Sequence, residues 1–246
     1  MKFYELFDDR YLKPISKYKR ELNEWNEILI KDCNEDLVSL NGVSNKIILE
    51  PQYYLNKVNG AYNDCKVRVT IKDKLVRIAE KLPDGYFLKI WDAFRSLETQ
   101  QALFDKYHDI FAKETNLEGD KLIEYTKKFV SLPSYDVNKP SPHNTGAVVD
   151  LTICDKSGNS IKLGTYFDDF ELKSYTRYYE ELLENGEKLT ELEQEILYNR
   201  RILCNLFEEE GFSNYPYEIW HKSYKDQMYC ELLDEEIAVY GSVEIK

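Results

Sequence analysis

Two short stretches, far apart in the chain, contain two of its three histidines. The first stretch holds His143 and Asp150, and the second holds Glu218 and His221. Neutral imidazole and carboxylate oxygen are zinc ligands, and a catalytic zinc site keeps three protein ligands and leaves the fourth position to water. We therefore predict that His143, Asp150 and His221 bind one Zn²⁺ per chain. Glu218 is then free to take a proton from the metal-bound water as a general base, and the residues predict a hydrolase.

The elements around these residues must bring them together. His143 ends a proline-rich segment, 131–144, which predicts a long ordered loop, and Asp150 lies in a predicted strand over 147–153. A lone carboxylate in such an apolar strand needs a partner, because an unpaired buried charge is costly. Residues three apart in a strand point to opposite faces. Glu218 and His221, in a predicted strand or strand-edge segment over 215–224, therefore require a bulge or bend to share one metal.

The remaining pattern predicts a mixture of helices and strands. Apolar residues at helical spacing, a capping box at Thr190 and Glu193, and an N-cap at Ser96 mark the helices. In the helix after the capping box, the predicted buried stripe includes Leu192, Ile196, Leu203 and Phe207. Strands are predicted at 46–50 and 86–94, and helices at 16–31, at 71–82, after Ser96 and after Thr190.

Composition limits the class of protein. The chain has 246 residues, 43% of them apolar, with no linker or repeat, so we predict one domain over 1–246. A net charge of −12 without a basic stripe argues against a nucleic-acid partner. The first residues lack the apolar run of a secretory signal and no 18-residue apolar stretch occurs, so we expect no membrane association and a cytoplasmic location. The five cysteines are expected to be buried thiols rather than disulfides or zinc ligands.

Four separated motifs resemble the zinc D-alanyl-D-alanine dipeptidase family, within the wider group of D-Ala-D-Ala peptidases. Order and approximate spacing agree from about Tyr86 to Tyr224, whereas residues 1–45 match nothing in the family and are expected to form a helical extension of unassigned role. The motifs are S-x-H-x-x-G-x-x-x-D at 141–150, E-x-W-H at 218–221, an aromatic-Arg stretch at 91–95 followed by Gln101-Ala102, and G-T-x-F-D at 164–168. Pro142 and Asn144, and Ala93-Phe94 before Arg95, depart from the usual family residues and leave the substrate preference open.

The resemblance implies a fold and a set of roles. The fold is a single α+β domain whose helices pack on a small antiparallel sheet carrying the zinc site, the D-Ala-D-Ala peptidase or hedgehog-like fold. The resemblance implies that His143, Asp150 and His221 bind zinc, that Glu218 is the general base and later proton donor, and that Arg95 stabilises the oxyanion. It also implies that Ser141 and Asp168 hold the ammonium group of a small dipeptide substrate.

Other readings of these residues stay open at the level of sequence. Arg95 is also suited to cap a helix or pair with Asp92, Asp168 to sit in a solvated turn, and His108 to pack on a helix. One alternative function is a D,D- or L,D-carboxypeptidase that trims longer cell-wall peptides, against which the missing signal segment argues. Another is a non-catalytic, zinc-stabilised binding protein, although three ligands with Glu218 and Arg95 favour catalysis.

Overall fold

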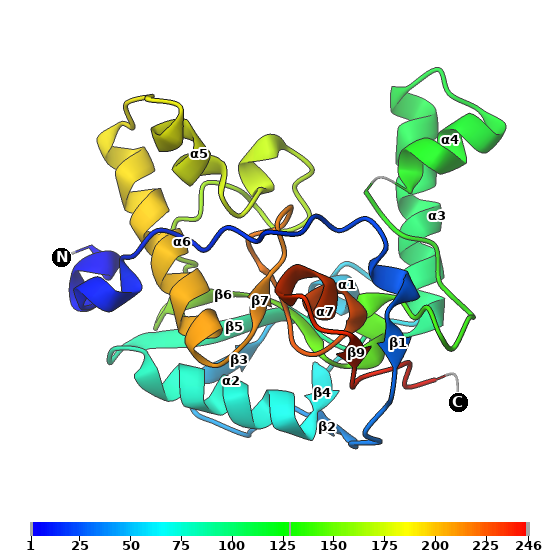
Figure 1. The fold of residues 1–246 in the computed structure, drawn as a ribbon, viewed down its shortest axis with the longest axis horizontal. Helices are drawn as coiled ribbons and strands as arrows, with labels where there is room; N and C mark the ends of the chain where they lie inside the picture. Colours follow the sequence, from blue (N-terminus) through cyan, green and yellow to red (C-terminus); the bar gives the residue numbers. More distant parts are fainter. Residues whose placement is uncertain (1, 128, 245–246) are drawn as a thin grey trace.

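The computed structural model describes residues 2–127 and 129–244. Its centre is a five-stranded sheet in the order β3-β5-β6-β8-β7 (Figure 1). All neighbouring pairs in this sheet are antiparallel except β3 with β5, which is parallel. The strands are β3 (Ile47–Leu49), β5 (Tyr86–Asp92), β6 (Val148–Asp155), β7 (Ser213–Asn214) and β8 (His221–Ser223). Two smaller sheets pair β1 (Leu29–Ile30) with β9 (Ile237–Ala238) and β2 (Leu37–Ser39) with β4 (Lys66–Arg68).

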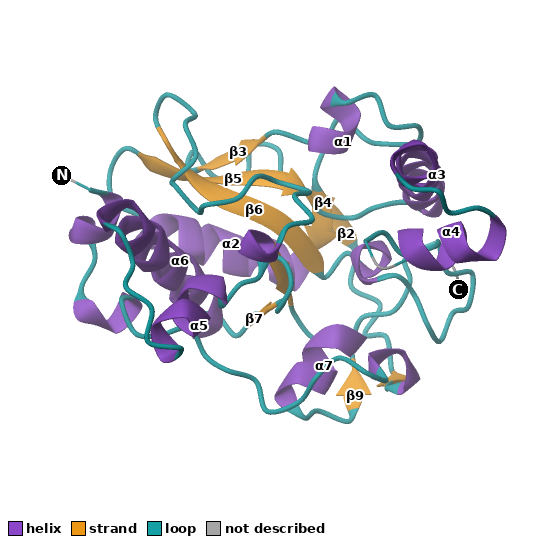
Figure 2. Ribbon diagram, turned by 90° about the horizontal axis from the view of Figure 1, so that it is seen from above, coloured by secondary structure: helices purple, strands orange, loops and turns teal. Residues whose placement is uncertain are grey.

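Helices surround the sheet and make the protein an α+β fold, as predicted (Figure 2). Among them, α3 and α4 form an arm at the end of the molecule away from α6 (Figure 1). The helices are α1 (Gln52–Leu55), α2 (Val69–Lys81), α3 (Leu97–Glu114), α4 (Gly119–Thr126), α5 (Tyr178–Glu184), α6 (Glu191–Glu209) and α7 (Gln227–Leu233).

The main core lies between one face of the sheet and helices α2 and α6. Strand β6 contributes Val149 and Leu151 to this core, while the alternate residue Asp150 belongs to the opposite face. Helix α2 adds Ile71, Leu75 and Ile78, and α6 adds Leu203 and Phe207. The apolar core therefore covers one face of the sheet, and Asp150 lies on the opposite face.

Most predicted elements are confirmed, with shifts of a few residues at their ends. The strands near 46–50, 86–94 and 147–153 and the helices near 71–82, after Ser96 and after Thr190 are all present. Ser96 accepts the Thr99 N–H, and the Thr190–Glu193 capping box is formed. The stripe on α6 is buried except at Leu192, which is 52% exposed because the first turn of the helix projects beyond the core.

Two sequence predictions were wrong. The helix expected over 16–31 is replaced by a 3-10 turn, Trp25–Glu27, followed by β1, and no α-helix occurs in residues 2–45. Tertiary contacts override the helical spacing, because β1 pairs with β9 near the other end of the chain. The strand expected over 215–224 is reduced to β8, because the residues before it form a turn.

Two further observations concern the whole chain. The described cysteines are all free thiols, and four are buried whereas Cys33 is exposed. None of the helices in residues 2–127 and 129–244 has the length and apolar character needed to cross a membrane.

Candidate active site and metal centre

A row of three polar residues crosses the middle of the sheet. In this row Asp150 of β6 lies opposite His221 of β8 and opposite Asp92 of β5. The register of β5 shifts between Ile90 and Asp92, which is a β-bulge that turns Asp92 toward the same face as Asp150. Cross-strand neighbours on one face lie close together. The sheet therefore places two carboxylates and an imidazole side by side.

His143 reaches this row from the loop that precedes β6. It lies in a 3-10 turn, Pro142–Thr145, which ends at Gly146 with φ of 70°. The Nδ1 of His143 lies 2.8 Å from the Ala93 carbonyl oxygen, so Nδ1 carries the proton and donates to it. This tautomer leaves Nε2 as a lone-pair donor, 3.3 Å from Asp150 Oδ2. His143 is thus held in an orientation suited to a metal ligand.

A turn, rather than a strand bulge, brings Glu218 and His221 to one site. The His221 N–H donates to the Glu218 carbonyl oxygen at 3.2 Å, which closes a turn directly before β8. The Glu218 carboxylate then lies 3.6 Å from His221 Nδ1. On the other side of the ring, His221 Nε2 lies 3.2 Å from Ser223 Oγ. The bend that the sequence required is therefore present.

The donor atoms of His143, Asp150 and His221 fit a Zn²⁺ ion. One ligand atom from each residue lies within 4.8 Å of the others, and all three residues are buried. Within the described residues Asp150 Oδ1 accepts no well-aligned hydrogen bond, although His221 Nδ1 is 3.2 Å away. Burial alone raises the pKa of Asp150, but the two histidines outweigh it and hold this pKa well below its usual range. A buried, ionised carboxylate between two imidazoles is a donor set that zinc accepts.

Glu218 lies beside this group in an environment suited to proton transfer. Burial raises the pKa of its carboxyl to about 7, and the nearby carboxylates of Asp150 and Asp168 act in the same direction. A divalent cation at the triad would lower this pKa again, because an opposite charge favours the ionised form. A carboxyl with a pKa near neutrality accepts and releases a proton readily.

Arg95 is held by neighbours on several sides. Its Nε and Nη2 donate to Asp92 Oδ2 at 3.0 and 2.8 Å, Nη1 donates to Gln100 Oε1 at 3.0 Å, and Nη2 donates to the Tyr53 hydroxyl at 3.2 Å. Of the five N–H groups of a guanidinium, one on Nη1 has no partner among the described residues. The pairing with Asp92 considered from the sequence is thus present, and the same arginine borders the cavity.

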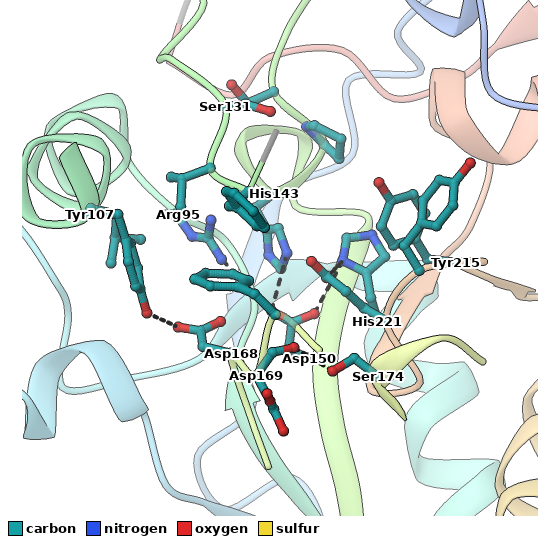
Figure 3. Close-up of a pocket in the computed structure, with 18 of the residues that line it drawn as sticks. Arg95, Tyr107, Ser131, His143, Asp150, Asp168, Asp169, Ser174, Tyr215 and His221 are labelled. Carbon is teal, nitrogen blue, oxygen red and sulfur yellow. Dashed lines mark hydrogen bonds and ion pairs between the residues drawn. The ribbon is translucent and has the colours of Figure 1, made fainter. Parts of the chain in front are cut away.

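Asp168 is not a solvated surface turn. Its carboxylate accepts hydrogen bonds from the hydroxyls of Tyr53 at 3.1 Å and Tyr107 at 3.3 Å. Burial raises the pKa of Asp168 to about 6, against the lowering effect of Arg95. Figure 3 shows Asp168 and Tyr107 on one side of the cavity, and His221 and Tyr215 on the other, with His143 and Asp150 between them.

One cavity of about 490 Å³ unites all the residues selected from the sequence. The helix residue His108 does not border it and packs near Phe104 on α3. The cavity is bordered by Arg95, Ser141, His143, Asp150, Asp168, Glu218 and His221.

Sequence reasoning considered Asp92 only as a partner of Arg95, and it did not select Gln100 or Ser223, which also hold site residues in place. Asp92 is 3.3 Å from His143 Nδ1 in addition to its contacts with Arg95. Gln100 joins Arg95 to the Ser131 carbonyl oxygen, to which its Nε2 donates at 2.7 Å. Its place one turn into the helix after Arg95 was the only available signal.

Comparison with known proteins bears on this arrangement. The sequence profile of the D-Ala-D-Ala dipeptidase family of M15 peptidases matches residues 66–239, which include the whole triad, Glu218 and Arg95. The chain belongs to this family. It is accordingly a metallopeptidase of the D-Ala-D-Ala dipeptidase family, as the motifs predicted.

Similar sequences occur among curated D-alanyl-D-alanine dipeptidases. One from Synechocystis sp. is 27% identical over 91% of this chain and 98% of its own length. Another from Enterococcus faecium is 24% identical over 72% of this chain and 78% of its own length. Among solved structures, a mutant of a vancomycin-resistance D,D-pentapeptidase in complex with Zn(II) has a TM-score of 0.40 at 17% identity, covering 82% of this chain and 88% of that one. VanYB in complex with D-alanine-D-alanine also has a TM-score of 0.40, at 16% identity, covering 86% of this chain and 94% of that one.

Proposed function

We propose that the protein hydrolyses the peptide bond of D-alanyl-D-alanine, or of a similar small dipeptide, with one Zn²⁺ held by His143, Asp150 and His221. The observation that carries the proposal is the meeting of these three ligand groups, Glu218 and Arg95 at one cavity. Zinc supplies Lewis-acid polarisation of the scissile carbonyl and lowers the pKa of water at its open position. Membership of the D-Ala-D-Ala dipeptidase family supports the substrate class.

The positions of Glu218, Arg95 and Asp92 support a role for each of them in this reaction. Glu218 accepts a proton from the attacking water and delivers it to the leaving amine, a role supported by the position of its carboxylate, 3.6 Å from His221 Nδ1. Arg95 stabilises the negative charge that develops on the scissile carbonyl oxygen, through the Nη1–H that the described neighbours leave free. Asp92 keeps the guanidinium in place as the charge forms.

The amino end of the dipeptide is assigned to Asp168 and Ser141. The Asp168 carboxylate has a fixed orientation, because two tyrosine hydroxyls donate to it, and an ammonium group would complete its partners. Ser141 lines the same cavity two residues before His143 and is 6% exposed. This requirement for a free ammonium would restrict the protein to dipeptides.

The decisive experiment measures alanine release by the zinc-loaded protein from three substrates in parallel. We expect cleavage of D-Ala-D-Ala and little or none of L-Ala-L-Ala or N-acetyl-D-Ala-D-Ala. Equal cleavage of the acetylated substrate would transfer the assignment to a carboxypeptidase that trims longer peptides. Zinc binding without cleavage of any of them would favour a non-catalytic zinc-binding protein. The cytoplasmic location stays a prediction, which fractionation of cells producing the protein would check.

A further inference from the structure

The proposed roles of these residues define how a dipeptide would be oriented in the cavity. Asp168 would hold the substrate ammonium, and the triad with Arg95 would hold the scissile carbonyl, so the first residue of the dipeptide must lie between these two points. The wall of the cavity beside Asp168 and Tyr107, on the side away from His221 and Tyr215, therefore lies next to this residue (Figure 3). The composition of that wall decides which side chain fits.

The uncharged residues of this wall are apolar and largely aromatic, and the charged residues Lys127, Asp169 and Glu171 also border the cavity. We call it the aromatic wall, and it consists of Leu103, Tyr107, Phe129, Val130 and Phe170. The ring of Phe170 lies 5.0 Å from Tyr107 and 5.0 Å from Phe129, so the three rings form a continuous surface. Leu103 and Val130 are buried, Phe129 and Phe170 are partly exposed, and all four border the cavity.

The aromatic wall is also joined to the reacting end of the cavity. Gln100 donates to the Ser131 carbonyl oxygen at 2.7 Å and accepts from Arg95 at 3.0 Å. The Gln100 side chain thus connects the backbone next to Val130 to the Arg95 guanidinium. Asp168 is bound to Tyr107 and lies two residues before Phe170. The aromatic wall is therefore linked to Arg95 through Gln100 and to Asp168 through Tyr107.

A methyl group is too small to use this surface. The cavity of about 490 Å³ lies in the size range of pockets that enclose much larger ligands than a dialanine. Apolar side chains gain affinity in proportion to the area that they remove from water. An alanine side chain at the first position would leave most of the aromatic wall in contact with solvent.

We propose that the aromatic wall is a binding pocket for a large apolar side chain on the first residue of the dipeptide. The preferred substrates are then dipeptides with a free amino group, a residue such as D-leucine or D-phenylalanine first, and D-alanine second. This inference rests on the proposed function, and it names the substrate class for the same site.

The test compares kcat/KM of the zinc-loaded protein for D-Leu-D-Ala, D-Ala-D-Leu and D-Ala-D-Ala. We expect D-Leu-D-Ala to exceed D-Ala-D-Ala by about 10-fold or more, since each added methylene in an apolar pocket is worth a substantial factor. D-Ala-D-Leu has the same atoms with the side chain at the other end, and it should gain less. A value for D-Leu-D-Ala equal to or below that for D-Ala-D-Ala would overturn the inference and leave the proposed function intact. Cleavage of none of the three would remove both.

Two variants locate the effect. Phe170→Ala removes the central ring of the aromatic wall and should reduce the ratio of the two kcat/KM values, D-Leu-D-Ala over D-Ala-D-Ala, several-fold toward one. Tyr217→Ala removes an aromatic ring that borders the same cavity on the Glu218 side and should leave this ratio unchanged. Phe170 is partly exposed and Tyr217 is exposed, so thermal unfolding curves should confirm that each variant is folded. A ratio that survives Phe170→Ala, or that falls equally in Tyr217→Ala, would contradict the assignment.

Discussion

At the scale of single residues, Asp150 is the group around which the other charges are arranged. It lies between His143 and His221, and Arg95 Nη2 approaches its Oδ2 to 3.7 Å. The two histidines and Arg95 surround the buried Asp150 carboxylate and keep it ionised, as the direction of its pKa shift indicates. The Glu218 carboxylate lies 3.6 Å from His221 Nδ1 and, in the proposed mechanism, is available for proton transfer.

Replacing Glu218 by glutamine tests whether Glu218 is the residue that transfers the proton. Glu218→Gln keeps the size of the side chain but cannot accept the proton, so we expect kcat to fall by about 10²-fold or more while zinc is retained. The measurement is turnover of D-Ala-D-Ala together with the zinc content of the purified variant. Glu236→Gln, at an exposed position, serves as the matched control. Undiminished turnover in Glu218→Gln would exclude the general-base role.

A second prediction concerns the negative charge of the Asp92 carboxylate. Asp92→Asn preserves the shape of the residue but removes the charge that faces both Arg95 and His143. Loss of such a supporting group commonly lowers activity or metal affinity by about 10- to 100-fold, and we expect kcat/KM for D-Ala-D-Ala to fall in that range. Zinc affinity measured by competition with a chromogenic chelator separates an effect on His143 from one on Arg95. Values equal to those of the exposed control Asp84→Asn would refute the role of Asp92.

At the scale of secondary structure, irregular backbone positions place the site. The bulge in β5 turns Asp92 to the reactive face, and the turn before β8 brings Glu218 beside His221. The 3-10 turn of His143 depends on Gly146, whose φ is 70° and whose Cα faces Leu37 closely. A Cβ at this glycine would lie 2.4 Å from Leu37 Cδ1. Positive φ and limited space therefore both favour glycine here.

Gly146→Ala is expected to disturb both stability and the metal site. The strained backbone and the contact with Leu37 should lower the free energy of unfolding by about 1–3 kcal/mol, and His143 should move with the turn. Urea denaturation and zinc affinity measure the two effects. Gly158→Ala, at another positive φ but with open space around it, separates backbone strain from the contact with Leu37. If Gly146→Ala behaves like Gly158→Ala in both measurements, the close contact is unimportant.

At the scale of the whole molecule, the N-terminal segment is fastened to α5 and α6. Glu180 of α5 accepts the Ile15 N–H at 2.9 Å and receives Arg201 of α6 in a two-pronged ion pair at 2.8 and 2.7 Å. The Glu180 side chain is only 5% exposed. Burial acts to raise its pKa, but Arg201 and the Ile15 N–H outweigh burial and lower this pKa below its ordinary value.

This contact predicts a dependence of stability on pH. Because the pKa of Glu180 is lower in the folded state, its contribution is complete above the unfolded value of about 4.5 and is lost as the pH falls through the folded value. Glu180→Gln should therefore reduce the free energy of unfolding by about 1–3 kcal/mol at pH 7, and by less at pH 3.5. Urea denaturation at both pH values measures the difference, with the exposed Glu187→Gln as control. A difference that does not shrink at low pH would contradict this account.

Much of the site could be predicted from the residue types alone. Imidazole and carboxylate groups have narrow chemical uses, so His143, Asp150, Glu218 and His221 could be selected from residue types, whereas Arg95 was selected through the family resemblance. All of them border one cavity. Six regular elements were also predictable, because apolar periodicity and capping residues are local signals: the strands near 46–50, 86–94 and 147–153 and the helices near 71–82, after Ser96 and after Thr190.

What only the tertiary structure decided depends on contacts between distant parts of the chain. The segment 16–31 has helical spacing but forms no α-helix. It contains a 3-10 turn and strand β1, whose partner β9 lies about 200 residues further along the chain. The bulge that turns Asp92, the link from Gln100 to Ser131 and the aromatic wall likewise join separate segments. The amino-acid sequence by itself determined which ligand and acid-base groups are available to the site, because the side-chain chemistry of each residue is local. The tertiary structure decided their directions and the space around the substrate, because both depend on which segments pack together.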